Sequence, residues 1–317
     1  MAFKKGGAMP VAVRKLIEQK RMHRKCKRVL NACIPMILLG TAIVSIVVTL
    51  GIVWTLGAET IAFFQRISFL KFVTETEWLP FFEADPHYGI APLLCGTFLV
   101  TGIAMIIAVP IGLGCAVFLA EYAPHSVKKM LKPALEILAG IPTIVYGFFA
   151  LTFVTPILQF FIPSLQFFNA LSSGIVIGIM MIPTIASLSE DAINAVPASL
   201  REASYGLGAT RFETIVKAVL PACATGVVAS IVLAASRAMG ETMIVVIAAG
   251  STPVFSLDAT ESIQTLTAYI VQVSLGDAPH GTTIYYSMYA AGAVLFIFTL
   301  GMNMLAQHIA RRFKEVY

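Results

Sequence analysis

The chain has 317 residues, of which 58% are hydrophobic and 12% are charged, and its mean hydropathy is +0.85. This composition excludes an ordinary soluble domain, in which about a quarter of the residues are charged. The net charge of +5 comes mainly from residues 1–28, which hold 10 Lys and Arg, so it indicates membrane topology and not a nucleic-acid-binding surface.

Six runs are apolar enough to cross a bilayer, since roughly 20 apolar residues span its hydrocarbon core. We therefore predict an all-α integral membrane protein with six transmembrane helices, at 31–56, 89–120, 134–161, 173–194, 221–250 and 283–310. The first run is longer than the apolar core of a cleaved signal peptide, so a retained helix is expected. Prolines occur inside several runs, which a helix bundle tolerates when neighbours satisfy the freed carbonyls.

The basic residues indicate how these spans are oriented. Besides the amino-terminal stretch, segments 122–133, 195–217 and 311–317 each hold three Lys or Arg. The alternate loops, 57–88 and 251–282, hold two basic residues against eight acids. The positive-inside rule then predicts that both termini and the 195–217 loop are cytoplasmic.

A polar stretch from Pro197 to Pro221 carries two helix-start signals. Both 199–202 and 210–213 have capping-box spacing, in which a hydroxyl and a carboxylate satisfy each other's backbone amides. Gly206 and Gly208 lie between them and permit a tight or left-handed bend. The stretch therefore predicts a short helix, a bend and a second short helix that leads into the fifth span. An ordinary pair of amphipathic surface helices is the alternative.

The spacing from Glu202-Ala203-Ser204 to Gly208, and then to Val219-Leu220-Pro221, resembles the "EAA" loop of ABC importer permeases. Ser204 replaces the second alanine of that pattern, and Ala218 replaces an isoleucine. In the family this loop is a cytoplasmic coupling helix that sits on the ATP-hydrolysing subunit. The resemblance thus assigns ATPase coupling to Arg201, Glu202, Ala203, Ser204, Gly206, Gly208 and Arg211.

Three further segments narrow the resemblance to PstC-type phosphate permeases: 140–147 (GIPTIVYG), 199–208 (SLREASYGLG) and 236–242 (SRAMGET). The similarity extends over nearly the whole chain from about residue 30. It implies a type I importer permease (MetI-like) fold in the inner membrane of a bacterium or archaeon. It also implies phosphate as substrate, with a PstA-type permease, two PstB-type ATPase subunits and a PstS-type binding protein as partners. PstA-type permeases share the coupling loop, so that partner role is an alternative.

On this reading the chain consists of a basic segment 1–28, a first helix 29–58, an outer segment 59–88, a permease domain 89–310 and a basic tail 311–317. The chain is not expected to be an enzyme or to hold a cofactor, because no G-x-x-x-x-G-K-[ST] phosphate loop occurs in it. ATP hydrolysis is assigned to a separate subunit. The basic segment would contact anionic lipid or a phosphate-signalling regulator, or would serve topology alone.

Arg237 and Glu241 are the sharpest candidates for a translocation path. Both fall within the fifth predicted span, where a charged side chain costs on the order of 2.5–3.5 kcal/mol unless it faces protein or water. Arg237 would lie about 24 Å along a helix from Pro221, and its guanidinium suits a tetrahedral oxyanion. Four-residue spacing puts Glu241 on the same helix face, so an internal ion pair is the structural alternative.

Three hydroxyl residues join them as path candidates. Ser236 and Thr242 flank the charged pair and would donate to an anion or bond within the helix, and Ser230 would line the path or pack against a neighbouring helix. The segment from Ile263 to Val273 is predicted to form an amphipathic helix at the outer surface, which would pack across the top of the bundle or contact a binding protein. No His or Cys pair has metal-ligand spacing, so no metal site is expected. Rival functions are a permease for sulfate, molybdate or phosphonate, and an ATP-independent secondary transporter.

Overall fold

The computed structural model describes the backbone of residues 11–82 and 84–312, and the side chains of residues 34–82, 84–276 and 278–309. The chain divides into two units between Thr55 and Leu56. Helix α1 (Val11–Phe64) begins in the first unit and ends in the second.

In the first unit, the described side chains from Ile34 to Thr55 are exposed along the helix. The apolar stretch Ile34–Phe64 is long enough to cross a membrane. A helix that exposes so many large aliphatic side chains needs lipid or another protein around it. The apolar helix continues to Phe64, beyond residue 58, where the first transmembrane helix is predicted to end.

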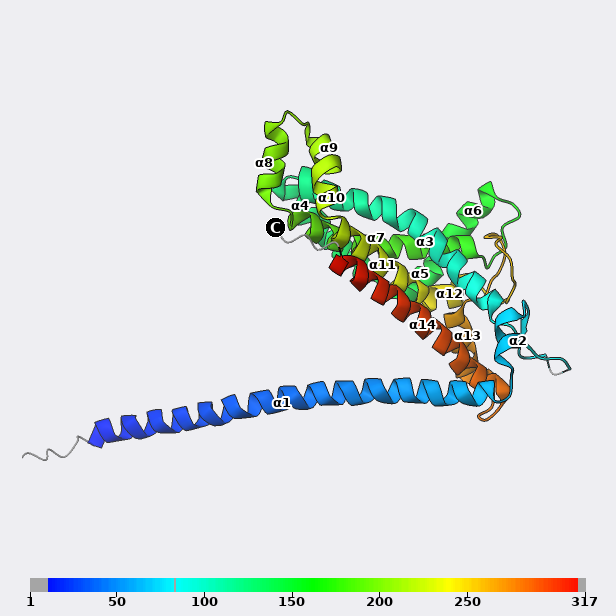
Figure 1. The fold of residues 1–317 in the computed structure, drawn as a ribbon, viewed down its shortest axis with the longest axis horizontal. Helices are drawn as coiled ribbons and strands as arrows, with labels where there is room; N and C mark the ends of the chain where they lie inside the picture. The colour runs from blue at the N-terminus through cyan, green and yellow to red at the C-terminus, as the bar shows by residue number, and fades with distance from the viewer. Residues whose placement is uncertain (1–10, 83, 313–317) are drawn as a thin grey trace, which may run out of the picture. The chain divides into compact units, whose positions relative to one another are not determined.

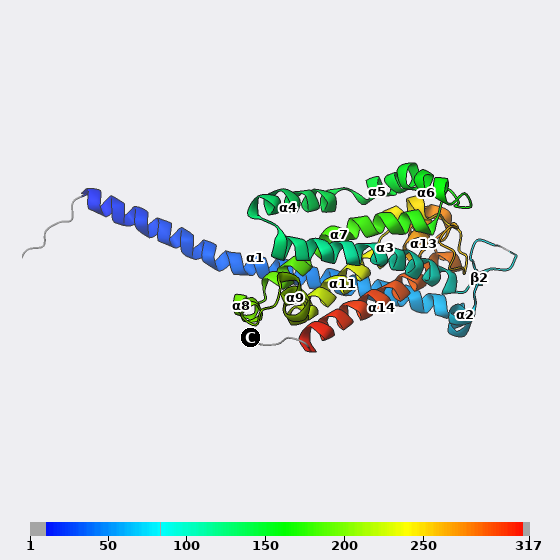
Figure 2. The same cartoon turned by 90° about the horizontal axis from the view of Figure 1, so that it is seen from above.

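The second unit is almost entirely helical (Figures 1 and 2). Its elements after α1 are α2 (Phe69–Thr74), β1 (Trp78–Leu79), β2 (His87–Tyr88), α3 (Ala91–Val117), η1 (Phe118–Tyr122), α4 (His125–Gly140), α5 (Thr143–Phe149), η2 (Ala150–Val154), α6 (Thr155–Phe161), α7 (Ala170–Asn194), α8 (Ala198–Gly206), α9 (Arg211–Thr214), η3 (Ile215–Val219), α10 (Leu220–Ala222), α11 (Ala224–Met239), α12 (Met243–Ala248), α13 (Leu266–Gln272), η4 (Val273–Asp277) and α14 (Thr283–Arg312). The strands β1 and β2 pair antiparallel, with Trp78 opposite Tyr88.

Helices α3 and α7 form the centre of this bundle and pack at close range. A Cβ on Gly178 would meet the carbonyl oxygen of Ala104 at 2.9 Å, and one on Gly174 would meet the Ile103 Cβ at 2.7 Å. Glycines four residues apart on one helix face let two backbones approach in a bilayer, where apolar side chains gain nothing by leaving lipid. The two helices therefore form one rigid pair.

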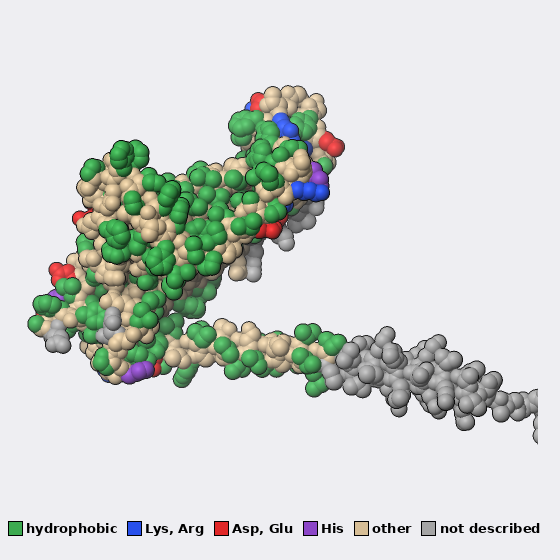
Figure 3. Space-filling model, turned by 180° about the vertical axis from the view of Figure 1, so that it is seen from behind, with side chains coloured by type: hydrophobic (Ala, Val, Ile, Leu, Met, Phe, Trp, Pro, Cys, Tyr) green, Lys and Arg blue, Asp and Glu red, His purple; other side chains and the backbone are tan. Residues whose placement is uncertain are grey.

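Charged side chains mark both ends of the 56–317 unit (Figure 3). Helices α8 and α9 lie at one end, together with the start of α4, and α2, the short hairpin and α13 lie at the other (Figure 1). On the face shown in Figure 3, charged side chains gather towards the ends, and hydrophobic side chains cover the surface between them. This is the distribution of a protein that spans a bilayer.

The third predicted span, 134–161, was wrong at its start. Helix α4 ends at Gly140, and α5 begins at Thr143 after Ile141 and Pro142 adopt extended backbone with ψ of 129° and 135°. Proline disfavours helical backbone in the residue before it, which explains the break. The membrane-crossing part is Thr143–Phe161. Helix α4 is a separate amphipathic segment with no fully buried residue.

The fifth predicted span, 221–250, is broken at both ends. The helices Arg211–Ala222 and Ala224–Met239 meet at a bend of 73°, and α12 starts only at Met243. Gly240 caps α11, and glycine is a poor helix former. Counted as one span, the bent pair completes the six that the sequence predicts, beside five unbroken helices in the described part of the chain.

The outer helix was predicted to start at Ile263 and to pack across the bundle or contact a binding protein. Helix α13 starts at Leu266, and the burial of Leu266, Ala268 and Tyr269 agrees with packing across the bundle. Tyr269 packs edge-on against Trp78 with ring centroids 4.9 Å apart, and its hydroxyl lies 2.5 Å from the Ser287 Oγ. The apolar face of α13 packs mainly against α14, α12 and α3, and Trp78 of β1 covers Tyr269.

Candidate coupling loop and translocation path

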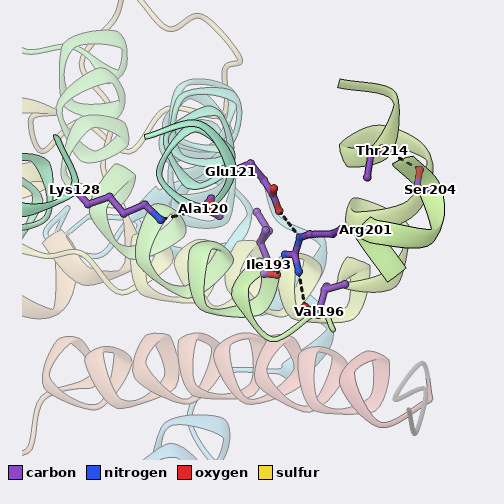
Figure 4. Close-up of polar contacts among 8 residues, drawn as sticks. All are labelled: Ala120, Glu121, Lys128, Ile193, Val196, Arg201, Ser204 and Thr214. Atoms are coloured by element: carbon purple, nitrogen blue, oxygen red, sulfur yellow. Dashed lines mark hydrogen bonds and ion pairs between the residues drawn. The ribbon is translucent and has the colours of Figure 1, made fainter. Parts of the chain in front are cut away.

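The polar stretch folds as two short helices, α8 and α9, that project from the bundle (Figure 1). A hydrogen bond between the hydroxyls of Ser204 and Thr214, 2.9 Å apart, joins them (Figure 4). After α9 the chain passes through η3 and α10 into α11. The predicted order of short helix, bend and second helix is confirmed.

The bend depends on Gly208, whose φ is +86°. The amide of Gly208 donates to the Tyr205 carbonyl at 2.9 Å, and that of Ala209 donates to the Ser204 carbonyl at 3.2 Å. This is the Schellman pattern, which ends a helix with a left-handed residue. A Cβ at Gly208 would have no atom within 4 Å, so only the backbone conformation selects glycine there.

One of the two predicted capping boxes forms. In the second, the amide of Thr210 donates to the Glu213 carboxylate at 3.0 Å, and the amide of Glu213 donates to the Thr210 hydroxyl at 3.3 Å. These bonds from Thr210, with Lys217 nearby, lower the pKa of Glu213 to about 2. The first box, at 199–202, does not form: the N-cap of α8 is Pro197 and not Ser199, so the helix begins at Ala198 without any side-chain cap.

Three large apolar side chains of the loop, Tyr205, Leu207 and Phe212, are exposed to the surroundings, and we call the surface that they form the docking face. Leu207 is 91% exposed and Phe212 is 67% exposed, and Tyr205 is also exposed. Glu202 and Ala203 lie exposed on the same α8 helix. Large apolar residues this exposed at a polar end of a molecule mark an interaction surface.

Arg201 does not belong to the docking face, although the sequence grouped it with those residues. Its Nε lies 2.9 Å from Oε1 of Glu121, and its other two nitrogens donate to the carbonyls of Val196 at 2.5 Å and Ile193 at 2.8 Å (Figure 4). The Glu121 side chain is 8% exposed and that of Arg201 is 19% exposed. The guanidinium therefore ties α8 to the end of α7 and to η1.

Arg211 contacts the residue next to Glu121. Its guanidinium carbon lies 4.8 Å from the centre of the Tyr122 ring, a cation–π contact. Two successive residues of η1 therefore hold both arginines of the loop. Sequence reasoning missed Glu121 and Tyr122, and the one available signal was a lone acid at the end of an apolar run.

Arg237 and Glu241 are not on one helix face as predicted, since α11 ends at Met239 between them. Among the described residues, no ion pair joins the two side chains. The Arg237 guanidinium is exposed and donates instead to the Thr184 hydroxyl of α7 at 3.3 Å. The backbone carbonyl of Glu241 accepts from the Thr267 hydroxyl at 2.8 Å. The bend at Cys223 also means that the straight helix assumed for the depth of Arg237 is absent.

The three hydroxyl candidates have different surroundings. Ser230 is buried, and its hydroxyl lies 2.7 Å from that of Ser189, so it joins α11 to α7. This contact supports the packing alternative for Ser230. Ser236 is buried as well, whereas Thr242 is half-buried and donates to the Gly240 carbonyl at 3.1 Å.

A cavity of about 390 Å³ lies between α4 and α7. Thr184, which receives the Arg237 bond, is among its lining residues. Lys132 and Glu190 also line it, with 2.9 Å between the ammonium and the carboxylate. Arg237 therefore connects through Thr184 to a charged cavity on the neighbouring helices. No group of three His, Cys, Asp or Glu suited to a metal ion occurs in the part of the chain that the structure describes.

Residues 108–315 match the family of binding-protein-dependent transport system inner membrane components. The chain is 35% identical to the probable ABC transporter permease protein YqgH of Bacillus subtilis, over 88% of this chain and 90% of that protein. It is 33% identical to the phosphate transport system permease protein PstC of Xylella fastidiosa, over 89% and 88% of the two chains.

Among solved structures, a chain of the MetNI methionine ABC transporter aligns with 72% of this chain and 95% of its own length. The TM-score is 0.53 and the sequence identity is 18%, so this likeness shows the fold alone. The fold is the MetI-like permease fold that the resemblance implied. Chains of this family are membrane subunits without catalytic activity, and their ATPase is a separate subunit. This chain belongs to the binding-protein-dependent transport system inner membrane components and, within them, to the PstC-type permeases.

Proposed function

We propose that this chain is a translocating subunit of an ATP-driven phosphate importer. The observation that carries the proposal is the exposed guanidinium of Arg237 on a broken membrane span. An arginine at such a position is not stable against lipid, so this face of α11 meets a partner subunit or a water-filled path. A guanidinium that is free of Glu241 retains its donors for an oxyanion.

Phosphate as the anion is supported by the names of relatives that match most of the chain, including PstC proteins of Xylella fastidiosa and Mesorhizobium japonicum. The partners we propose are a PstA-type permease, a PstS-type binding protein and two PstB-type ATPase subunits. The docking face, with Leu207 and Phe212 at its centre, would contact the ATPase. Both termini and the docking face would then lie on the cytoplasmic side, in agreement with the distribution of Lys and Arg.

The path we propose passes Arg237 and Glu241, with Thr242 at the helix break between α11 and α12. Glu241 would repel the anion and aid its release, since like charges at short range are unfavourable. Ser236 and Ser230 are buried and support α11 from the side that faces away from the proposed path.

The test is uptake of labelled phosphate into proteoliposomes that contain this chain with its permease partner, the ATPase and the binding protein. Uptake that needs ATP and resists excess sulfate, molybdate and phosphonate is expected. ATP-dependent uptake of one of those competitors would retain the permease and change its substrate. Uptake that persists without the ATPase would contradict the proposal and favour a secondary transporter.

A further inference from the structure

Two successive residues of η1 contact the coupling loop. Glu121 accepts from the Arg201 Nε at 2.9 Å, and the next residue, Tyr122, lies under the Arg211 guanidinium. Glu121 is almost fully enclosed, and the same arginine also bonds two carbonyls at the end of α7 (Figure 4). One guanidinium thus joins the last turn of the α3 span, the end of α7 and the start of the loop.

The bonds of Arg201 attach the start of the coupling loop firmly to the helix bundle. The last carbonyls of a helix have no partner within the helix and carry its negative dipole end, which favours a cation there. A guanidinium supplies its donors in a planar fork, so the carboxylate of Glu121 on one edge fixes the direction of the other donors. Because the Arg201 side chain is only 19% exposed, loss of the carboxylate would leave a partly buried arginine without its counter-charge.

The attachment points away from the docking face. Leu207 and Phe212 are exposed, whereas Arg201 and Glu121 lie on the bundle side of the loop. Apolar residues beneath the loop, Ile193, Val196 and Val219, form a buried cluster with Ala116 of α3. Removal of the Glu121 carboxylate would therefore leave the docking face intact and loosen only the link to the bundle.

We propose that Glu121 is a positioning residue for energy coupling. Its carboxylate orients Arg201 so that the loop moves as one body with the rigid α3–α7 pair when the ATPase subunits close. Arg201 then acts through this internal link and not by contact with the ATPase. The inference rests on the proposed function, because it needs an ATPase on the docking face.

The experiment compares the wild-type complex with Glu121→Ala, Glu121→Gln and Arg201→Lys in proteoliposomes, and measures both ATP hydrolysis and phosphate uptake. We expect each variant to retain the ATPase on purification, while the ATP hydrolysed per phosphate imported rises by roughly fivefold or more, the low end of a coupling free energy. The matched control is Lys217→Gln, which removes an exposed charge from the same loop and leaves the ratio unchanged.

Two results would overturn the proposal. Hydrolysis and uptake that fall together at a constant ratio would show that the residue only supports the fold, and loss of the ATPase from the complex would place Glu121 in docking. If the Glu121→Ala complex does not assemble, the ratio of ATP hydrolysed to phosphate imported is measured on the isosteric Glu121→Gln variant instead. Glu121→Ala combined with Arg201→Ala should cost no more than either change alone if the two act as a unit. If phosphate is not the substrate, the wild-type complex will not take it up, and this result is distinct from a change of ratio in the variants.

Discussion

The ammonium of Lys132 lies 2.9 Å from the carboxylate of Glu190, and the two side chains differ sharply in exposure, at 47% and 4%. This ion pair links α4, which has no fully buried residue, to the central helix α7. This difference in exposure determines which of the two side chains costs more stability when it is removed. A lysine released from the pair reaches water, whereas the glutamate remains enclosed.

We therefore expect Lys132→Ala to destabilise the chain more than Glu190→Gln. The lysine change strands a buried carboxylate, at a cost on the order of 1–3 kcal/mol, although Asn194 still donates to it at 3.3 Å. Thermal unfolding of the purified chain in detergent measures both variants. Lys129→Ala, a change of the same type at an exposed residue of α4, is the control. A larger loss for Glu190→Gln would contradict the asymmetry.

Gly208→Val should weaken coupling through its backbone. A β-branched residue at φ +86° costs about 1–2 kcal/mol even though the site is open. We expect uptake to fall while ATP hydrolysis continues. Gly206→Ala is the matched control, since this residue is helical and open and alanine favours helices. Gly208→Asn should be milder, because asparagine tolerates left-handed backbone. Unchanged coupling in Gly208→Val would argue against a required bend.

Arg237→Gln should abolish phosphate uptake while the complex still assembles in the membrane. The change removes the charge but retains a hydrogen-bond donor for Thr184, which the arginine contacts at 3.3 Å. Thr184→Val serves as the comparison, because it removes that contact and leaves the guanidinium; uptake should then fall only in part. Uptake of the Arg237→Gln complex at the wild-type rate would refute a role for this residue in the path.

Leu207→Asp should release the ATPase from the permease. A carboxylate on the most exposed apolar residue of the docking face would be desolvated on binding, which is unfavourable without a partner. Co-purification of the ATPase subunits measures the loss. Leu257→Asp is the matched control, because that leucine is 77% exposed and lies in the segment between α12 and α13. Equal retention of the ATPase by both variants would mean that the docking face lies elsewhere.

The capping box of α9 should remain intact over the physiological pH range. A carboxylate whose pKa is lowered from 4.5 to about 2 by folding adds stability above its ordinary pKa, and that stability is lost as the pH falls towards 2. Carbon NMR of glutamate-labelled protein, with Glu213→Gln for assignment, should place the midpoint near 2. Thr210→Val removes the hydrogen bond between the Thr210 hydroxyl and Glu213, and this change should raise the titration midpoint of Glu213. A midpoint near 4.5 in the wild type would contradict the cap.

The sequence by itself determined the membrane class, the number of spans and the helix–bend–helix loop. These features depend on local chemistry: apolar length sets a span, a hydroxyl and a carboxylate three residues apart set a cap, and glycine permits left-handed backbone. Gly208 and the Thr210–Glu213 box confirm that reading. The match at 199–202 failed because Pro197 had already started the helix.

Only the tertiary structure decided which charges meet. Spacing along one helix paired Arg237 with Glu241, but α11 ends before Glu241, and Arg237 donates instead to Thr184. Arg201 meets Glu121, a residue 80 positions earlier in the chain, and Lys132 meets Glu190. A buried charge is stabilised by whichever counter-charge the packing of distant helices brings within hydrogen-bonding distance, and local periodicity carries no information about that choice.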